Sequence, residues 1–463
     1  MQNFYLKSPL IWFIIIIIIV SGCKPDEPID ENSLDQNLIS EIRARSADGS
    51  LDFFKLPLQD SYSELNPDSY YSALPSDPQN PITAAKVELG KNLYHETLIG
   101  TQSEMPVCYQ TYSCASCHHA AASFQSGLAQ GIGDGGYGFG NNGDNRQRRP
   151  EYPIDKVDIQ QLKSPTVLNC AYQNLMLWNG QFGATGLNIG TESNWTEGTP
   201  KETNFMGYQG VETQAVAGLK VHKLAPGLEV LEAIPGYVQL FAKAFPNEPP
   251  QSRINQKNVG LAIAAYERTI VANEAPFQNW LNGDYNAMSD LEKEGALLFF
   301  GKGNCVSCHT GPALNKMDFY ALGLNDLVNG QHGIFGIDME KPDHKGRGGF
   351  TNRQEDMYKF KVPQLYNLKG QKYLGHGSQF HSVREIINYK NNAIPSNPNV
   401  PMEQLAEEFK PLHLNASEID AITKFIEEAL YDPYLERYLP QGLPSGNCFP
   451  NNDQLSRQQL GCD

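Results

Sequence analysis

Apolar side chains recur at helical spacing along much of this chain. Val259, Ile263, Tyr266 and Ile270 lie three or four positions apart, so we predict a helix over residues 255–270. Strict alternation of apolar and polar residues, which indicates half-buried strands, is scarce. The pattern therefore predicts a mainly α fold.

Three more helices follow from spacing and capping. Apolar spacing predicts a helix within residues 81–98, and Ser289 with Glu292 forms a capping box that starts another. An amphipathic closing helix is predicted over residues 417–430, where the apolar face comprises Ile419, Ile422, Phe425, Ile426 and Leu430. Between the helices, residues 127–143, 183–210 and 310–355 are rich in glycine or polar residues, so we predict long loops there.

The N-terminus has the pattern of a targeting segment. Lys7 precedes an apolar run over residues 10–20, which is short for a membrane span, and small residues then lead to Cys23. This resembles a bacterial lipoprotein signal over residues 1–22, with Cys23 as the lipidated residue; a simple uncleaved anchor is the alternative. Both place the remaining chain outside the cytoplasm, tethered to a membrane. Residues 23–50 are polar, and we predict a tether.

Composition narrows the function. The chain has 463 residues, 40% hydrophobic and 19% charged, which fits an ordinary globular protein of two or three domains. The formal net charge of -16 gives no electrostatic support for nucleic-acid binding. An acidic surface could steer a small basic electron-transfer protein, although it more often serves solubility.

The chemistry lies in two Cys-x-x-Cys-His motifs, Cys114-Ala115-Ser116-Cys117-His118 and Cys305-Val306-Ser307-Cys308-His309. This motif attaches haem c: both thiols bond to the haem vinyl groups and the histidine ligates iron. A zinc site built from the two cysteine pairs would leave both histidines unexplained. We therefore predict two covalently bound haems in two tandem cytochrome c-like domains with long loops, spanning residues 51–285 and 286–440, followed by a tail over residues 441–463.

The remaining cysteines suit an oxidising compartment. Cys448 and Cys462 form a natural local pair that would staple the tail. Cys108 and Cys170 are then the residual pair, although sequence does not fix this connectivity. The Gly131-x-Gly133-x-x-Gly136 pattern has no strand before it, which argues against a dinucleotide site and favours a loop over the edge of a haem.

Over residues 81–434 the chain resembles the bacterial dihaem cytochrome c peroxidases. The resemblance rests on several segments besides the haem motifs. They are Leu89-Gly90-Lys91, Ser164-Pro165-Thr166-Val167-Leu168-Asn169, Leu177-Trp178-Asn179-Gly180, Ala262-Ile263-Ala264-Ala265-Tyr266-Glu267-Arg268-Thr269, Phe360-Lys361-Val362-Pro363-Gln364-Leu365-Tyr366-Asn367, and Tyr373 with His376-Gly377.

The resemblance implies a division of labour. The family reduces hydrogen peroxide to water with two electrons from a small cytochrome or copper protein, and its members are often dimers. The haem on His118 would be the peroxidatic centre, and the haem on His309 the electron-entry centre. Trp178 matches the family tryptophan between the haems, which would relay electrons, although a purely packing role is the alternative.

The peroxidatic site departs from the family pattern. Residues 120–163 contain no histidine that could cap the first haem, and His119 is too close to His118 in sequence to reach the opposite face easily. We expect this haem to be open without reductive activation. Where the family places a distal glutamate, this chain has His222, our candidate acid–base residue; a surface or propionate-binding histidine is the alternative. Glu212 is a poorer candidate.

The second haem and the calcium site also depart. Where the family usually supplies a methionine, this chain has Tyr389 and Lys390, either of which could be the sixth ligand; Met357 has no positional support. Lys163 stands where the family has a calcium-ligating asparagine, and an ammonium cannot ligate calcium. Calcium therefore stays open, with backbone carbonyls around Lys361 as its remaining ligands.

Two other functions compete with a peroxidase. A missing distal glutamate and a tyrosine ligand would suit a dihaem oxidase of a partner protein. Two fully ligated haems would suit an electron-transfer protein without a substrate.

Overall fold

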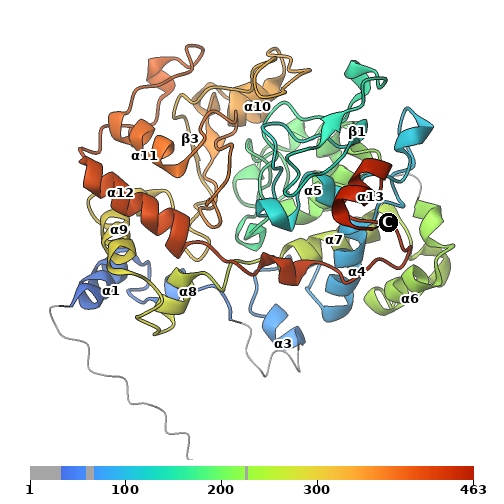
Figure 1. Ribbon diagram of the computed structural model, residues 1–463, viewed down its shortest axis with the longest axis horizontal. Coiled ribbons are helices and arrows are strands. Elements are labelled where there is room, and N and C mark those ends of the chain that lie inside the picture. The colour runs from blue at the N-terminus through green and yellow to red at the C-terminus, as the bar shows by residue number, and fades with distance from the viewer. Residues whose placement is uncertain (1–32, 59–66, 225–227, 463) are drawn as a thin grey trace, which may run out of the picture.

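The computed structural model describes residues 33–58, 67–224 and 228–462. Over this part the chain is mainly α, as the apolar spacing predicted, with long connections and two short antiparallel strand pairs (Figure 1). The helices are α1 Leu34–Arg45, α3 Pro67–Tyr71, α4 Ala84–His95, α5 Gly210–Val221, α6 Pro235–Ala244, α7 Gln256–Glu267, α8 Pro276–Leu281, α9 Asp290–Phe300, α10 Gly346–Thr351, α11 Val383–Asn392, α12 Ala416–Lys424 and α13 Gln454–Leu460. The antiparallel strand pairs are β1 Gly136–Tyr137 with β2 Gln147–Arg148, and β3 Phe319–Tyr320 with β4 Phe360–Lys361.

Two of the predicted helices, α7 and α9, begin at residues whose side chains cap them. The Asn255 side chain accepts from the Asn258 amide at the start of α7, and both hydrogen bonds of the Ser289–Glu292 capping box are present at α9. The predicted closing helix is α12, which continues as a π-helical turn, Phe425–Ala429.

Helices α4, α5, α6 and α7 form what we call the first lobe, in which α4 and α5 both pack on α7 (Figure 1). Glycines permit this close contact. A Cβ atom at Gly90 would lie 1.9 Å from the Ala262 carbonyl oxygen, and one at Gly260 would lie 2.5 Å from a Val216 methyl. These helices therefore touch backbone to backbone, which fixes the frame beside the first haem motif.

Helices α9, α11 and α12 form the second lobe, in which α9 packs on α12, and α1 packs on α9 (Figure 1). The prediction that residues 23–50 are a tether is wrong for α1. Leu38 and Ile42 are fully buried, and Asp35 forms an ion pair with Lys293 at 2.8 Å and accepts from Trp280 Nε1 at 2.7 Å. Apolar residues at helical spacing within a polar stretch were enough to dock this helix.

Helices α1 and α13, the first and last of the described chain, each pack on the lobe that is distant from them in sequence. While α1 joins the second lobe, the C-terminal tail with α13 returns to the first lobe (Figure 1). Cys448 and Cys462 form the predicted disulfide within this tail. The prediction of a Cys108–Cys170 disulfide is wrong: both are free thiols, and they are buried in separate hydrophobic clusters.

No helix in residues 33–58, 67–224 and 228–462 is long and apolar enough to cross a membrane. The predicted signal over residues 1–22, with Cys23, lies outside the described residues.

Candidate haem sites

The first haem motif begins in a short 3-10 turn, Cys114–Ser116, that follows α4 and its loop. The Tyr94 hydroxyl of α4 donates to the His118 carbonyl at 2.6 Å, which ties the motif to the helical frame. Burial is the main cause that lowers the pKa of His118 to about 4. The ring is therefore neutral near pH 7, as an iron ligand must be.

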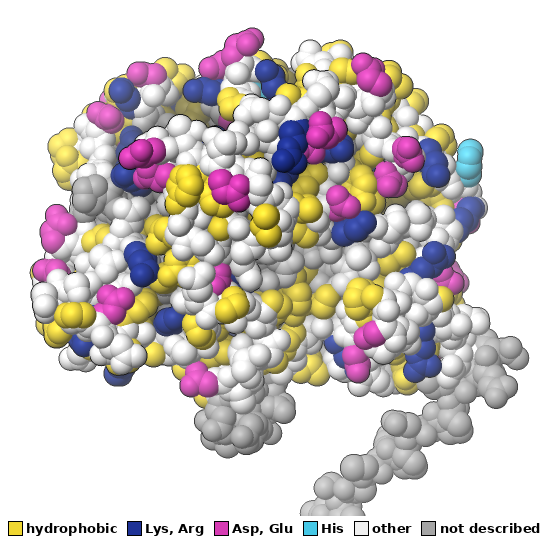
Figure 2. All heavy atoms as spheres, turned by 180° about the vertical axis from the view of Figure 1, so that it is seen from behind, with side chains coloured by type: hydrophobic (Ala, Val, Ile, Leu, Met, Phe, Trp, Pro, Cys, Tyr) yellow, Lys and Arg dark blue, Asp and Glu magenta, His cyan; other side chains and the backbone are white. Residues whose placement is uncertain are grey.

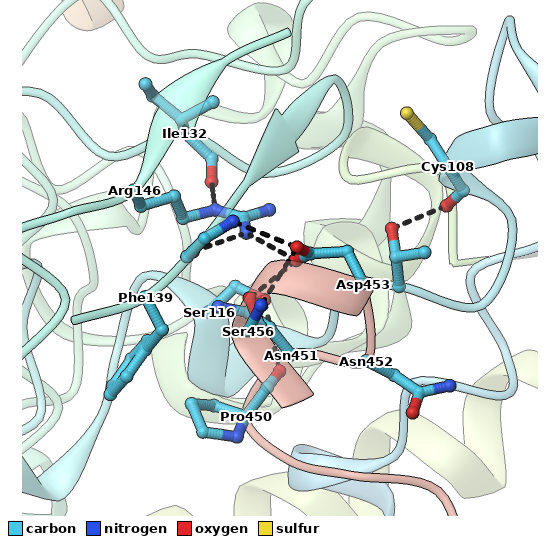
Figure 3. Close-up of polar contacts among 12 residues, drawn as sticks. Cys108, Ser116, Ile132, Phe139, Arg146, Pro450, Asn451, Asn452, Asp453 and Ser456 are labelled. Carbon is cyan, nitrogen blue, oxygen red and sulfur yellow. Dashed lines mark hydrogen bonds and ion pairs between the residues drawn. The ribbon is translucent and has the colours of Figure 1, made fainter. Parts of the chain in front are cut away.

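The glycine-rich loop lies against this motif. A Cβ atom at Gly131 would lie 2.6 Å from Ser164 Oγ and 3.1 Å from Cys117 Sγ, so only glycine fits. Arg146 braces the loop from within: its Nε donates to the Ile132 carbonyl at 2.5 Å and its Nη2 to the Gly133 carbonyl at 2.6 Å (Figure 3). The predicted loop is present apart from the two residues of β1, and it contacts Cys117 of the motif; that it covers the edge of a haem stays a prediction.

The C-terminal tail closes over the same region (Figure 3). Asp453 accepts from the Gly138 amide at 3.0 Å and lies 3.9 Å from Arg146 Nη1. Ser116, inside the haem motif, donates to the Pro450 carbonyl at 3.3 Å and hydrogen bonds to the Asn451 side chain. The tail thus holds both the loop and the motif.

His222 caps the C-terminus of α5. Its Nδ1 lies 2.8 Å from Asp158 Oδ2. Burial by itself would lower the pKa of His222, but the Asp158 carboxylate outweighs burial and raises it. His222 also stands near the first motif, because its charge contributes to the lowered pKa of His118. His222 therefore lies within electrostatic reach of His118, and its role as an acid–base residue stays a prediction.

Glu212 is committed elsewhere. Its carboxylate accepts from Arg268 Nε and Nη2, both at 2.7 Å, and both side chains are fully buried. A bidentate buried pair of this kind leaves little freedom for proton transfer. This agrees with the lower ranking of Glu212 from sequence.

His119 is enclosed by the glycine-rich loop. Its ring packs edge-on against Phe139, and a Cβ atom at Gly143 would lie 2.3 Å from His119 Nε2. Burial lowers the pKa of His119 to about 3, so the ring is neutral. Its position fits the expectation that it does not cap the first haem.

In the second motif, backbone carbonyls hold His309 through its Nδ1 atom. His309 Nδ1 lies 3.1 Å from the carbonyl oxygens of both Leu314 and Pro363. As a donor to a carbonyl, Nδ1 carries the proton, which leaves Nε2 as the nitrogen for iron. The histidine is oriented as a proximal ligand requires.

Tyr389 and Lys390 are placed differently on α11. The Tyr389 hydroxyl lies 2.6 Å from the Leu322 carbonyl and 2.9 Å from that of Gly323, so its proton is held by backbone. Lys390 lies seven residues after Val383 and three after Ile387, both buried, so it shares their inward face. Its charge interacts with Cys308, Cys305 and His309, which puts the amine beside the second motif. Met357 instead packs against Gly348 of α10.

Trp178 joins the two lobes. Its Nε1 donates to the Lys163 carbonyl at 2.8 Å, and its own carbonyl accepts from the Lys361 amide at 2.7 Å. Pro165, two residues past Lys163, interacts through its backbone with His118, and Pro363, two residues past Lys361, accepts from His309. Trp178 therefore links the segment of Lys163, through its indole, to the segment of Lys361, through its backbone.

The calcium position does not fit a cation ligand set. Lys163 is buried, and its ammonium donates to the Ser126 carbonyl at 3.2 Å and to that of Leu128 at 3.5 Å. The Lys163 ammonium thus binds the carbonyl oxygens that a calcium ion could otherwise use. Within the described ranges no group of three or more His, Cys, Asp or Glu side chains is arranged to hold a metal ion.

Both motifs fit a haem. Each has a neutral, partly exposed histidine, with desolvation lowering the pKa of His309 to about 4 as well, and two thiols at the required spacing. Burial raises the pKa of Cys114, Cys117 and Cys305 to about 12, so these thiols are inert unless modified. Haem chemistry is therefore the function that the donor set supports.

The comparisons agree with this assignment. Residues 84–286 match the sequence model of the family described as di-haem cytochrome c peroxidase. Over this range the chain is similar to that family. It is an oxidoreductase of the cytochrome c peroxidase type that uses two haems.

Similar proteins cover most of the chain. Methylamine utilization protein MauG of Methylorubrum extorquens is 26% identical over 366 residues, 78% of this chain and 82% of its own length. Cytochrome-c peroxidase IdrP1 of Pseudomonas sp. strain SCT is 29% identical over 391 residues, 79% of this chain and 87% of its own. Among solved structures, a MauG-like protein associated with microbial copper homeostasis matches with a TM-score of 0.53 and 18% identity, covering 78% of this chain and 93% of that chain. This last likeness concerns the fold alone.

Three residues of the site were missed from sequence: Asp158, Arg146 and Asp453. Each is a single charged residue in a polar loop or tail, and its partner is 64 residues away for Asp158 and 307 residues away for the Arg146–Asp453 pair. No local pattern marks such a residue.

Proposed function

We propose that this protein reduces hydrogen peroxide to water at the His118 haem, with electrons from a small redox protein that enter at the His309 haem. Both haems are proposed to be bound covalently through their cysteine pairs. The observation that carries the proposal is the difference between the two motifs: an acid–base pair, His222 with Asp158, stands beside the first, and an inward-facing lysine stands beside the second.

The chain's residues would divide the work as follows. A haem with an open face supplies iron that binds peroxide and accepts the electrons in turn. His222 takes a proton from one peroxide oxygen and returns it to the other, which leaves as water when the O–O bond breaks. The balance is one peroxide, two electrons and two protons to two waters.

Trp178 would carry electrons between the haems. Its hydrogen bonds to Lys163 and Lys361 support this, because each of these residues belongs to a segment that reaches one proximal histidine. Trp178→Phe should leave the first reaction with peroxide intact and slow re-reduction of the first haem at least tenfold. An unchanged re-reduction rate in stopped-flow measurements would make Trp178 a packing residue.

We propose Lys390 rather than Tyr389 as the sixth ligand of the second haem. Burial lowers the pKa of Lys390, which favours the neutral amine that iron needs, whereas burial raises the pKa of Tyr389 and disfavours a phenolate. Lys390→Met should change the low-spin electron paramagnetic resonance signal and raise the potential of this haem. Tyr389→Phe, its neighbour and control, should change neither; the reverse result would assign the tyrosine.

The donor, the anchor and the oligomeric state belong to the same proposal. Acidic and basic side chains are interspersed on the face in Figure 2, so this face offers no patch of a single sign for a donor. We propose that the mature chain is lipid-anchored at Cys23, faces the periplasm or exterior, and forms a homodimer. Metabolic labelling with palmitate, followed by mass spectrometry, tests the anchor.

The function is tested on the purified holoprotein. We expect a high-spin signal from the first haem in the fully oxidised state and fast peroxide turnover with a reduced small cytochrome. His222→Ala should lower turnover at least tenfold with both haems retained. An all-low-spin spectrum without turnover would favour an electron-transfer protein, and slow turnover with a long-lived oxidised state would favour an oxidase of a partner protein.

A further inference from the structure

The carboxylate of Asp158 is built into the wall of the first haem site. Its backbone amide donates to the Asp134 carbonyl at 3.0 Å, and its carbonyl accepts from the Gly133 amide at 2.9 Å. A Cβ atom at Gly133 would lie 2.1 Å from Asp158 Oδ2, so the carboxylate packs directly on the loop backbone. Asp158 therefore has a fixed position before any ligand binds.

The pairing with His222 leaves one ring nitrogen for chemistry. Nδ1 faces Asp158 at 2.8 Å, and none of the described residues hydrogen bonds to Nε2. The Asp158 side chain is 6% exposed and the His222 side chain 34%, so the buried member is the carboxylate. An anion that accepts the Nδ1 proton fixes both the tautomer and the ring orientation.

The neighbouring charges do not compete for His222. Lys223, the next residue, forms an ion pair with Asp134 at 2.8 Å, and Asp134 also hydrogen bonds to the Tyr152 hydroxyl. The His118 ring, which also interacts with His222, is neutral near pH 7 because desolvation lowers its pKa. Asp158 also interacts with Cys117, so the pair lies beside the motif.

We propose that Asp158 is the positioning residue of the peroxide reaction, holding His222 with its proton on Nδ1 and Nε2 turned to the substrate. This inference rests on the proposed function. In the step, Nε2 accepts the peroxide proton while Asp158 stabilises the imidazolium that forms, and Nε2 then returns the same proton to the departing oxygen.

The pH profile separates positioning from simple structural support. His222 must be neutral to accept a proton, so the rate should rise with pH through its pKa. Asp158→Asn keeps a hydrogen-bond acceptor but removes the charge, so the acid limb should move to lower pH and the plateau should fall about tenfold. Asp158→Ala should lower the plateau further. Asp155→Asn, an exposed residue of the same loop, is the matched control and should match the wild type.

The experiment uses the two-haem holoprotein and two readouts. The first is the second-order rate constant for peroxide with the oxidised protein between pH 5 and 9. The second is the rate of cyanide binding, since hydrogen cyanide must also give a proton to a nearby base. A lower plateau with an unmoved acid limb in both readouts would overturn the proposal and leave Asp158 structural. A wild type that binds cyanide but does not turn over peroxide would refute the proposed function instead.

Discussion

Removing the carboxylate of Glu212 should destabilise the first lobe far more than an ordinary surface change. Glu212 joins α5 to Arg268 just after α7 through two hydrogen bonds of 2.7 Å, and neither side chain is exposed. In Glu212→Ala the described residues leave the guanidinium three neutral acceptors: the Gln209 side chain at 3.1 Å, the Pro75 carbonyl at 3.2 Å and the Ala171 carbonyl at 3.4 Å.

The expected loss is about 3–5 kcal/mol, the usual cost of leaving one member of a buried ion pair without its partner. Glu212→Gln keeps the shape and one acceptor oxygen, so it should lose less. The matched control is Glu202→Ala, which breaks an exposed pair with Lys220 of α5 at 4.0 Å and should cost less than about 1 kcal/mol.

The assay is urea unfolding of the holoprotein, followed by circular dichroism, with haem content checked first. A loss in Glu212→Ala no larger than in the Glu202→Ala control would refute the assignment of Glu212 to structure. A second outcome bears on mechanism. Where Glu212→Gln is folded, it should turn over peroxide within about twofold of the wild type, because its carboxylate faces Arg268 rather than the haem site.

Three further predictions follow from other contacts. Cys448→Ser with Cys462→Ser opens a loop with a sequence separation of 14 and should cost about 3 kcal/mol, seen as a lower Tm; an unchanged Tm would mean that the tail is held without it. Gly131→Ala places a Cβ atom 2.6 Å from Ser164 Oγ and should lower the haem content towards one per chain in a pyridine haemochrome assay. Gly442→Ala, in open space, is the control and should keep two haems. Burial lowers the pKa of Lys361 from 10.5 to about 7, so between these pH values the unfolded chain binds more protons and the free energy of unfolding should rise with pH. Lys361→Met should reduce this rise, measured by urea unfolding at pH 7 and 9.5. An equal rise in the variant and the wild type would contradict the prediction.

The haem motifs and some helix starts could be predicted from the sequence because each depends on residues a few positions apart. Cysteine spacing within five residues set both haem motifs, and side-chain caps at Asn255 and Ser289 marked helix starts that the structure has. The tether prediction failed at α1 because it relied on the mean polarity of residues 23–50, which conceals three apolar residues that are buried: Leu38, Ile39 and Ile42. The Cys108–Cys170 prediction failed because it paired the two cysteines that were left over, without any information on the distance between them. The two thiols lie in separate hydrophobic clusters.

The sequence by itself determined the cofactor, the mainly α fold and His222 as a candidate, since these depend on residue type and short spacing. Only the tertiary structure decided what each candidate faces. Long-range contacts joined Asp158 to His222, tied Glu212 to Arg268, turned Lys390 inward and wrapped the tail over the first motif. The physical reason is that a side chain's role depends on burial and on its partner, and folding sets both across separations of tens to hundreds of residues.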